Sequence, residues 1–97
     1  MLEIDPEGME IRHLNAAVDL KHATLLEVGC GDGRLTFKYA GAPKRVIGIE
    51  PGAPLLASAQ SNCPADFRPH VHFVQATAMA LPFPDDTFDV VLFAKSL

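Results

Sequence analysis

Three glycines at alternate positions, Gly29, Gly31 and Gly33, follow directly on the short apolar run 24–28. Such a run predicts a buried parallel strand, and the glycines predict a turn that passes close to a ligand. A helix that begins near Gly33 would direct its free backbone N–H groups back toward that turn. The pattern therefore predicts an α/β chain with a nucleotide-type site at the carboxyl end of its first strand.

The spacing of the glycines distinguishes between kinds of nucleotide. Dinucleotide-binding loops follow the pattern G-x-G-x-x-G, in which the third glycine packs the helix against the strand. Here Arg34 occupies that position and the third glycine comes one residue early, at Gly33. A nicotinamide-dependent dehydrogenase is therefore the least favoured of the functions considered. A tight turn without a ligand stays open as the simplest alternative.

A second apolar run, residues 45–49, also ends in an acid, Glu50. This acid follows the glycine loop by about 20 residues, the distance at which a carboxylate accepts hydrogen bonds from ribose hydroxyls. Its two oxygens could hold both the 2′- and the 3′-hydroxyl. The alternative for a lone Glu is a solvated acid at the end of a strand.

A third segment, residues 71–93, completes a family pattern. The run Glu27-x-Gly29-x-Gly31-x-Gly33, the acid Glu50, Leu-Pro-Phe at 81–83 and Phe-Asp-Val-Val at 88–91 stand in one order. Together they resemble class I S-adenosylmethionine-dependent methyltransferases, in particular the small-molecule enzymes of ubiquinone and menaquinone biosynthesis. The resemblance covers most of residues 24–97. It implies a methyltransferase with S-adenosylmethionine as cofactor and a small molecule as methyl acceptor.

The resemblance also implies a cofactor site. Its expected residues are Glu27, Gly29, Cys30, Gly31, Gly33, Glu50, Pro51, Leu55, Thr77 and Ala78. Glu27, with Asp32, would balance the positive charges of the ligand, or Glu27 would instead order the loop through backbone N–H groups. Leu55 would pack on the adenine or simply lie in the helix core.

One position departs from the family pattern. Thr77 stands where the family usually has an Asp that accepts from the adenine amino group. A hydroxyl can still accept that hydrogen bond, but without charge, so the contact would be weaker. Ala78 would offer its backbone N–H to the adenine ring, which requires no particular side chain.

No catalytic residue can be named from the sequence, because methyl transfer from a sulfonium depends mainly on in-line positioning. His13, His22, His70 and His72 are candidate bases by residue type alone. His70 and His72 would share a strand face, but a metal site is disfavoured because no third ligand lies nearby in the sequence. Asp89 is expected to have a structural role, and Asp85 and Asp86 to form a solvated turn.

The expected layout is one partial domain over residues 1–97 with a Rossmann-like, doubly wound parallel sheet. A helix is expected over residues 7–20, and strands over 24–28, 45–49, 71–74 and 88–93. Shorter helices would cover residues 33–40 and 54–61. Right-handed crossovers would give the strand order 3-2-1-4, counted from the strand 24–28, in a three-layer α/β/α arrangement.

The resemblance covers only the N-terminal, cofactor-binding half of the family's domain. A chain that stops at Leu97 would leave the apolar strand 88–93 with an unpaired edge, which is an aggregation hazard. We therefore expect either a longer natural protein or a homodimer through this strand. The alternative to an enzyme is a non-catalytic half-domain that binds S-adenosylmethionine.

Composition narrows the class of partner. A length of 97 residues with 48% hydrophobic and 21% charged residues suits one globular domain. The net charge of -4 and the lack of a basic run disfavour nucleic-acid binding.

The apolar runs are strand-sized, so no membrane span is expected. No signal-peptide pattern is present, and Cys30 and Cys63 lack metal spacing, which predicts a cytoplasmic protein with reduced thiols.

Overall fold

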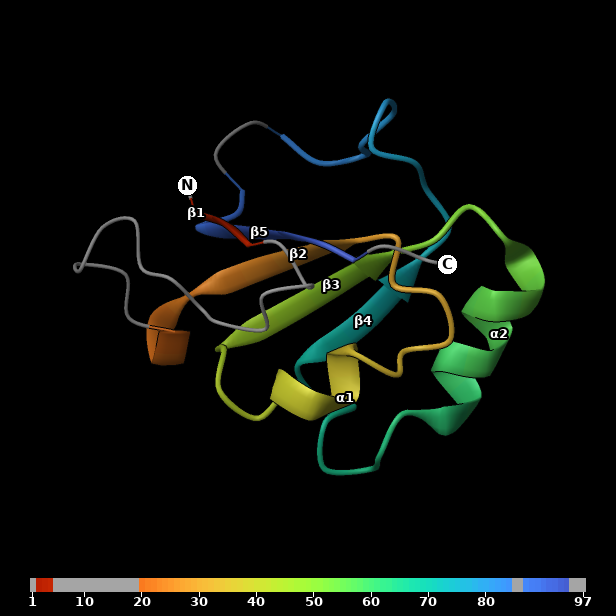
Figure 1. The fold of residues 1–97 in the computed structure, drawn as a ribbon. Coiled ribbons are helices and arrows are strands. Elements are labelled where there is room, and N and C mark those ends of the chain that lie inside the picture. Colours follow the sequence, from red (N-terminus) through yellow and green to blue (C-terminus); the bar gives the residue numbers. More distant parts are fainter. Residues whose placement is uncertain (1, 5–19, 85–86, 95–97) are drawn as a thin grey trace.

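The computed structural model describes residues 2–4, 20–84 and 87–94, which form a five-stranded parallel sheet (Figure 1). The strands are β1 (Leu2–Ile4), β2 (Thr24–Val28), β3 (Arg45–Ile49), β4 (Val71–Val74) and β5 (Val90–Phe93). Their order across the sheet is β1-β5-β2-β3-β4, and every neighbouring pair is parallel. The predicted order of the last four strands is therefore confirmed, with an additional strand beside β5.

The strand expected at 88–93 begins two residues later, at Val90. Asp89 explains the difference, because its backbone N–H donates to Thr24 O and its Oδ2 accepts from Thr24 N, both at 2.9 Å. The Asp89 carboxylate thus accepts from the Thr24 N–H group, which a longer strand ladder would use. This pair ties the start of β5 to the start of β2, so the expected structural role of Asp89 is confirmed.

The expected unpaired edge of the strand 88–93 is wrong. β1 pairs with β5 along its whole length, from Leu2 opposite Val90 to Ile4 opposite Leu92. Both edges of β5 therefore carry hydrogen-bonded neighbours, and the argument for a homodimer through this strand loses its basis. The sequence analysis missed β1 because three residues are too few to display a strand pattern.

In the described part of the chain, two helices and one 3-10 turn connect the strands. The turn η1 (Leu20–His22) precedes β2, α1 (Thr36–Tyr39) follows it, and α2 (Ala53–Asn62) lies between β3 and β4. α1 is shorter than the expected helix over 33–40, and Gly33 itself is excluded from it by a φ of +87°, which a right-handed helix cannot contain. α2 ends before Cys63, which is extended because Pro64 follows it. The helix expected over 7–20 lies outside the described residues, except for its last residue.

The sheet has two differently covered faces. α1 and α2 lie on one side, and the segment between β4 and β5 crosses the other (Figure 1). The first core includes Leu25, Val46, Val71, Val90 and Leu92, and the second is centred on Leu26, Ile49 and Val91. On the second face, the described part of the chain supplies Phe83 and Phe88, in an edge-to-face pair, rather than the helix of a third layer.

The helices among the described residues are too short or too polar for any of them to cross a membrane. The carboxyl ends of β2, β3, β4 and β5 lie at the same edge of the sheet, because parallel strands share one direction. The candidate site is therefore built where β2, β3, β4 and β5 end.

Candidate functional site

The glycine loop, residues 29–33, leaves the end of β2 with left-handed backbone at all three glycines. The φ values are +77° at Gly29, +57° at Gly31 and +87° at Gly33. The N–H groups of Gly29 and Cys30 both donate to Ile49 O, at 2.9 and 3.0 Å. The loop is thereby folded over the end of β3, in a conformation that other residues adopt only with strain.

The three glycines differ in what surrounds them. A Cβ at Gly29 would lie 2.8 Å from Ala94 O, and one at Gly33 would lie 2.6 Å from the Phe37 ring. A Cβ at Gly31 would meet nothing within 4 Å among the described residues. The backbone contact therefore requires glycine at Gly29, and a Cβ at Gly33 would displace the Phe37 ring. The middle of the loop faces open space that a ligand can occupy.

Glu50 links this loop to the turn after β3. Its Oε1 accepts from Gly31 N at 3.0 Å and its Oε2 accepts from Gly52 N at 2.8 Å. The side chain is buried. Because each carboxylate oxygen has two acceptor positions, both oxygens can still accept a further hydrogen bond. The acid expected to bind ribose therefore lies against the glycine loop with unused acceptor capacity.

Glu27 is fully buried and does not contact the loop backbone as one expectation required. Its Oε1 accepts from Thr36 Oγ1 at 2.8 Å and from the Tyr39 hydroxyl, so it binds α1 instead. Its Oε2 is buried with no partner in the described part of the chain. Burial raises the pKa of Glu27, while the hydrogen bonds from Tyr39 and Thr36 lower it. The expectation that Glu27 orders the loop is wrong; that interaction belongs to Glu50.

Cys30 and Tyr39 are neutral neighbours of this carboxyl. Burial, followed by the charges of Glu27 and Glu50, raises the pKa of Cys30 to about 12. Burial also raises the pKa of Tyr39 well above its usual value, with the charge of Glu27 as the second cause. Cys30 is therefore a protonated thiol at neutral pH, and the Tyr39 hydroxyl is a hydrogen-bond donor to Glu27.

The remaining expected residues lie on the segments that follow β3 and β4. Leu55, at the start of α2, is 43% exposed while Leu56 and Ala59 are buried, so its placement in the helix core is wrong. Thr77 and Ala78 are exposed in the turn after β4, which a hydrogen bond from Ala80 N to Thr77 O closes at 3.1 Å.

Pro51 is connected to β4 by a residue that the sequence analysis missed. Gln75, directly after β4, donates from Nε2 to Pro51 O at 3.0 Å. The signal available in the sequence was a polar residue at the end of an apolar strand, and such a residue alone predicts no partner. This bond joins the turns after β3 and β4, next to Glu50.

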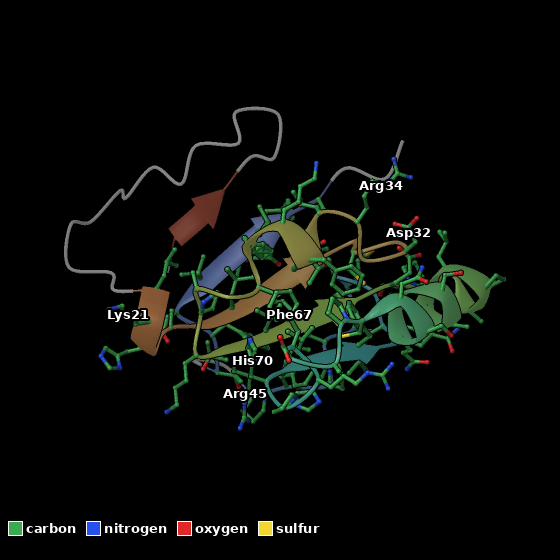
Figure 2. All side chains as sticks on the ribbon, turned by 90° about the horizontal axis from the view of Figure 1, so that it is seen from below. Lys21, Asp32, Arg34, Arg45, Phe67 and His70 are labelled. Carbon is green, nitrogen blue, oxygen red and sulfur yellow. The ribbon has the colours of Figure 1, made fainter. Side chains whose placement is uncertain are left out.

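Asp32 turns toward its own loop. It accepts from Arg34 N at 3.1 Å and lies 3.6 Å from the Arg34 guanidinium. Figure 2 shows both residues at one end of the sheet, with Arg45 and His70 at the other. His70 lies at the far end, with Nε2 2.7 Å from Ala40 O, and His72 is exposed. The structure thus places His70 away from the glycine loop, while His13 lies outside the described residues.

Comparison with known proteins identifies the group to which the chain is related. The family model described as a methyltransferase domain matches residues 25–97. A demethylmenaquinone methyltransferase from Thermus thermophilus is 37% identical over 93 residues, covering 90% of this chain and 42% of that protein. A 2-phytyl-1,4-naphtoquinone methyltransferase from Trichormus variabilis is 33% identical over 78 residues, covering 76% of this chain and 34% of that protein.

Solved structures agree with the sequence comparison. The YcgJ protein from Bacillus subtilis aligns with a TM-score of 0.66 and 29% identity, over 75% of this chain and 31% of that one. A putative S-adenosylmethionine-dependent methyltransferase from Listeria monocytogenes aligns with a TM-score of 0.67 and 27% identity, over 78% and 35%. The chain thus spans less than half the length of these relatives. Because the family pattern covers residues 25–97, including the glycine loop, Glu50 and β5, the chain belongs to the methyltransferase-domain family.

Proposed function

We propose that the chain binds S-adenosylmethionine at the glycine loop and forms the cofactor-binding part of a methyltransferase with a small-molecule acceptor. The observation that carries the proposal is the buried Glu50 carboxylate, which lies against Gly31 at the end of β3 and retains acceptor capacity. Residues 1–97 are proposed as a single partial domain. Membership of the family supports the choice of cofactor over a dinucleotide.

The residues present fit the chemical groups of this cofactor. Glu27 offers a buried, unpartnered carboxylate oxygen for the ammonium or sulfonium charge. The open side of Gly31 admits the methionine part, and Glu50 accepts from the ribose hydroxyls. Leu55, Thr77 and Ala78 are exposed beside the turns after β3 and β4 and suit contact with the adenine. Gly29, Cys30, Gly33 and Pro51 shape the backbone around these groups.

When bound, the cofactor supplies a methyl group activated by its sulfonium. The chain's own part in the reaction is to bind and orient this group, which contributes to the rate through positioning. A naphthoquinol is the first acceptor class to test, because two relatives are named as methyltransferases of such quinones. A cytoplasmic location is proposed from the two free cysteines.

Calorimetric titration of the 97-residue chain with S-adenosylhomocysteine tests the proposal, with NAD as the control ligand. We expect saturable binding of the first ligand alone, weakened at least about tenfold by Glu50→Ala, because a charged acceptor for hydrogen bonds is lost. Asp66→Ala removes an exposed acid outside the site and should leave binding unchanged. Circular dichroism verifies that each variant is folded. Absence of binding by the folded chain, or binding unaffected by Glu50→Ala, would contradict the proposed site.

A further inference from the structure

Glu27 is held through one oxygen only. Its Oε1 accepts hydrogen bonds from two hydroxyls, those of Thr36 and Tyr39, and both donors belong to α1. Its Oε2 is buried and has no partner among residues 2–4, 20–84 and 87–94. Two hydroxyls converge on one oxygen, so the acceptor positions of the other oxygen are all unused.

A buried carboxylate with an unused oxygen destabilises a fold. The loop that begins two residues after Glu27 is the one proposed to hold the methionine part of the cofactor, and that part carries an ammonium group. An ammonium placed near Oε2 would satisfy the unused oxygen and favour the ionised carboxylate. A cationic ligand group that is not part of the chain would therefore supply the partner that this oxygen lacks.

We propose that Tyr39, together with Thr36, is a positioning residue of the cofactor site, whose hydroxyl fixes Oε1 of Glu27 and leaves Oε2 for the ammonium of the cofactor. The inference rests on the proposed function. It concerns two residues on α1 that act on the ligand only through Glu27. Tyr39 is suited to the role because a phenol is protonated at neutral pH and therefore a donor, and burial raises its pKa further.

Removal of the Tyr39 hydroxyl has a predictable electrostatic consequence. The hydrogen bond from Tyr39 lowers the pKa of Glu27 against the effect of burial, so its loss lets Glu27 hold a proton at higher pH. A protonated Glu27 attracts an ammonium less. The other titratable group beside Glu27 is Cys30, whose own neighbours are Glu50 and Asp32. These three groups are unchanged in a Tyr39→Phe variant. A difference in ligand affinity between this variant and the parent chain therefore reports the effect of the Tyr39 hydroxyl.

Calorimetry with two ligands tests the inference on the 97-residue chain. S-adenosylhomocysteine carries the ammonium, and 5′-methylthioadenosine keeps the adenosine thioether but lacks the amino acid group. Tyr39→Phe should weaken the first ligand roughly tenfold near pH 7, the worth of one hydrogen bond to a charged group, and the second less than about twofold. Thr36→Val should act in the same direction. Thr87→Val removes a hydroxyl that donates to Pro84 O, away from Glu27, and should change neither ligand.

A pH profile separates positioning from a structural role. In Tyr39→Phe, affinity for S-adenosylhomocysteine should recover as the pH is raised and Glu27 ionises, and the affinity of the parent chain should change less over the same series of pH values. A loss that is independent of pH, or unchanged binding in Tyr39→Phe, would overturn the inference and leave the proposed function intact. If the parent chain does not bind S-adenosylhomocysteine, both the inference on Tyr39 and the proposed function are overturned. The profile decides the matter even where 5′-methylthioadenosine binds too weakly to measure.

Discussion

The backbone carbonyl of Ala94 lies where a side chain on Gly29 would have to go. A Cβ at Gly29 would approach Ala94 O to 2.8 Å, a distance that real Cβ atoms do not show, and Gly29 also has φ +77°. The hydrogen bond from Ala94 N to Val28 O, at 2.9 Å, holds the end of β5 against this position. The glycine therefore serves two needs at once, a left-handed turn and a close approach of two backbones.

This relationship predicts different effects for two substitutions in the same loop. Gly29→Ala should lower the free energy of unfolding by roughly 2–4 kcal/mol, because positive φ and the contact with Ala94 O add. Gly31→Ala should lower it by about 1–2 kcal/mol, since only the φ of +57° opposes the new methyl group. Urea denaturation of both variants measures the difference. Equal losses would mean that β5 moves aside and that the close contact does not constrain the loop.

Much of the fold could be predicted because parallel strands buried on both faces have a strong apolar signal. The bounds of β2, β3 and β4 are as expected, and the crossover rule gave their order with β5. The shorter α1 was not foreseen, because the left-handed conformation that excludes Gly33 from the helix is not fixed by the residue type alone. β1 has only three residues, and pairing with β5 rather than local pattern defines it.

The sequence predicted which residues form the site better than it predicted the contacts between them. Glycine spacing and the position of Glu50 are readable along the chain, and the structure brings Glu50 to Gly31. The partners of Glu27 are not readable, because Tyr39 reaches it only through the particular turn of α1. Loop ordering, one of the two roles expected for Glu27, is thus performed by Glu50. A hydrogen bond between side chains on different elements depends on packing, which periodicity does not encode.

The burial of Glu27 predicts a specific dependence of stability on pH. Its pKa is raised in the folded chain, so the folded state binds more protons than the unfolded state between the two pKa values. Stability contributed by Glu27 is therefore present below the unfolded pKa and lost as the pH rises through the folded one. The slope from this single group cannot exceed about 1.4 kcal/mol per pH unit.

Comparison of the parent chain with Glu27→Gln isolates this dependence from the other titrating groups. The free energy of unfolding of the parent chain, minus that of Glu27→Gln, should increase as the pH falls from about 7 to about 5. Urea denaturation at several pH values measures it, with Asp66→Asn as an exposed control for which no such trend is expected. A difference that stays constant or decreases over this range would show that Glu27 is ionised without penalty in the fold.

Cys30 is predicted to be unreactive even though it lies in the glycine loop. The thiolate is the reactive form, and a pKa of about 12 leaves very little of it at neutral pH. In a Cys63→Ser variant, which retains Cys30 as its one cysteine, alkylation by iodoacetamide near pH 8 should be roughly a thousandfold slower than that of free cysteine. Mass spectrometry follows the rate, and the same variant unfolded in urea should react at the ordinary rate. Rapid alkylation of the folded variant would mean that the loop opens to solvent and exposes Cys30, in conflict with its 5% exposure and with the hydrogen bonds that fold the loop over Ile49.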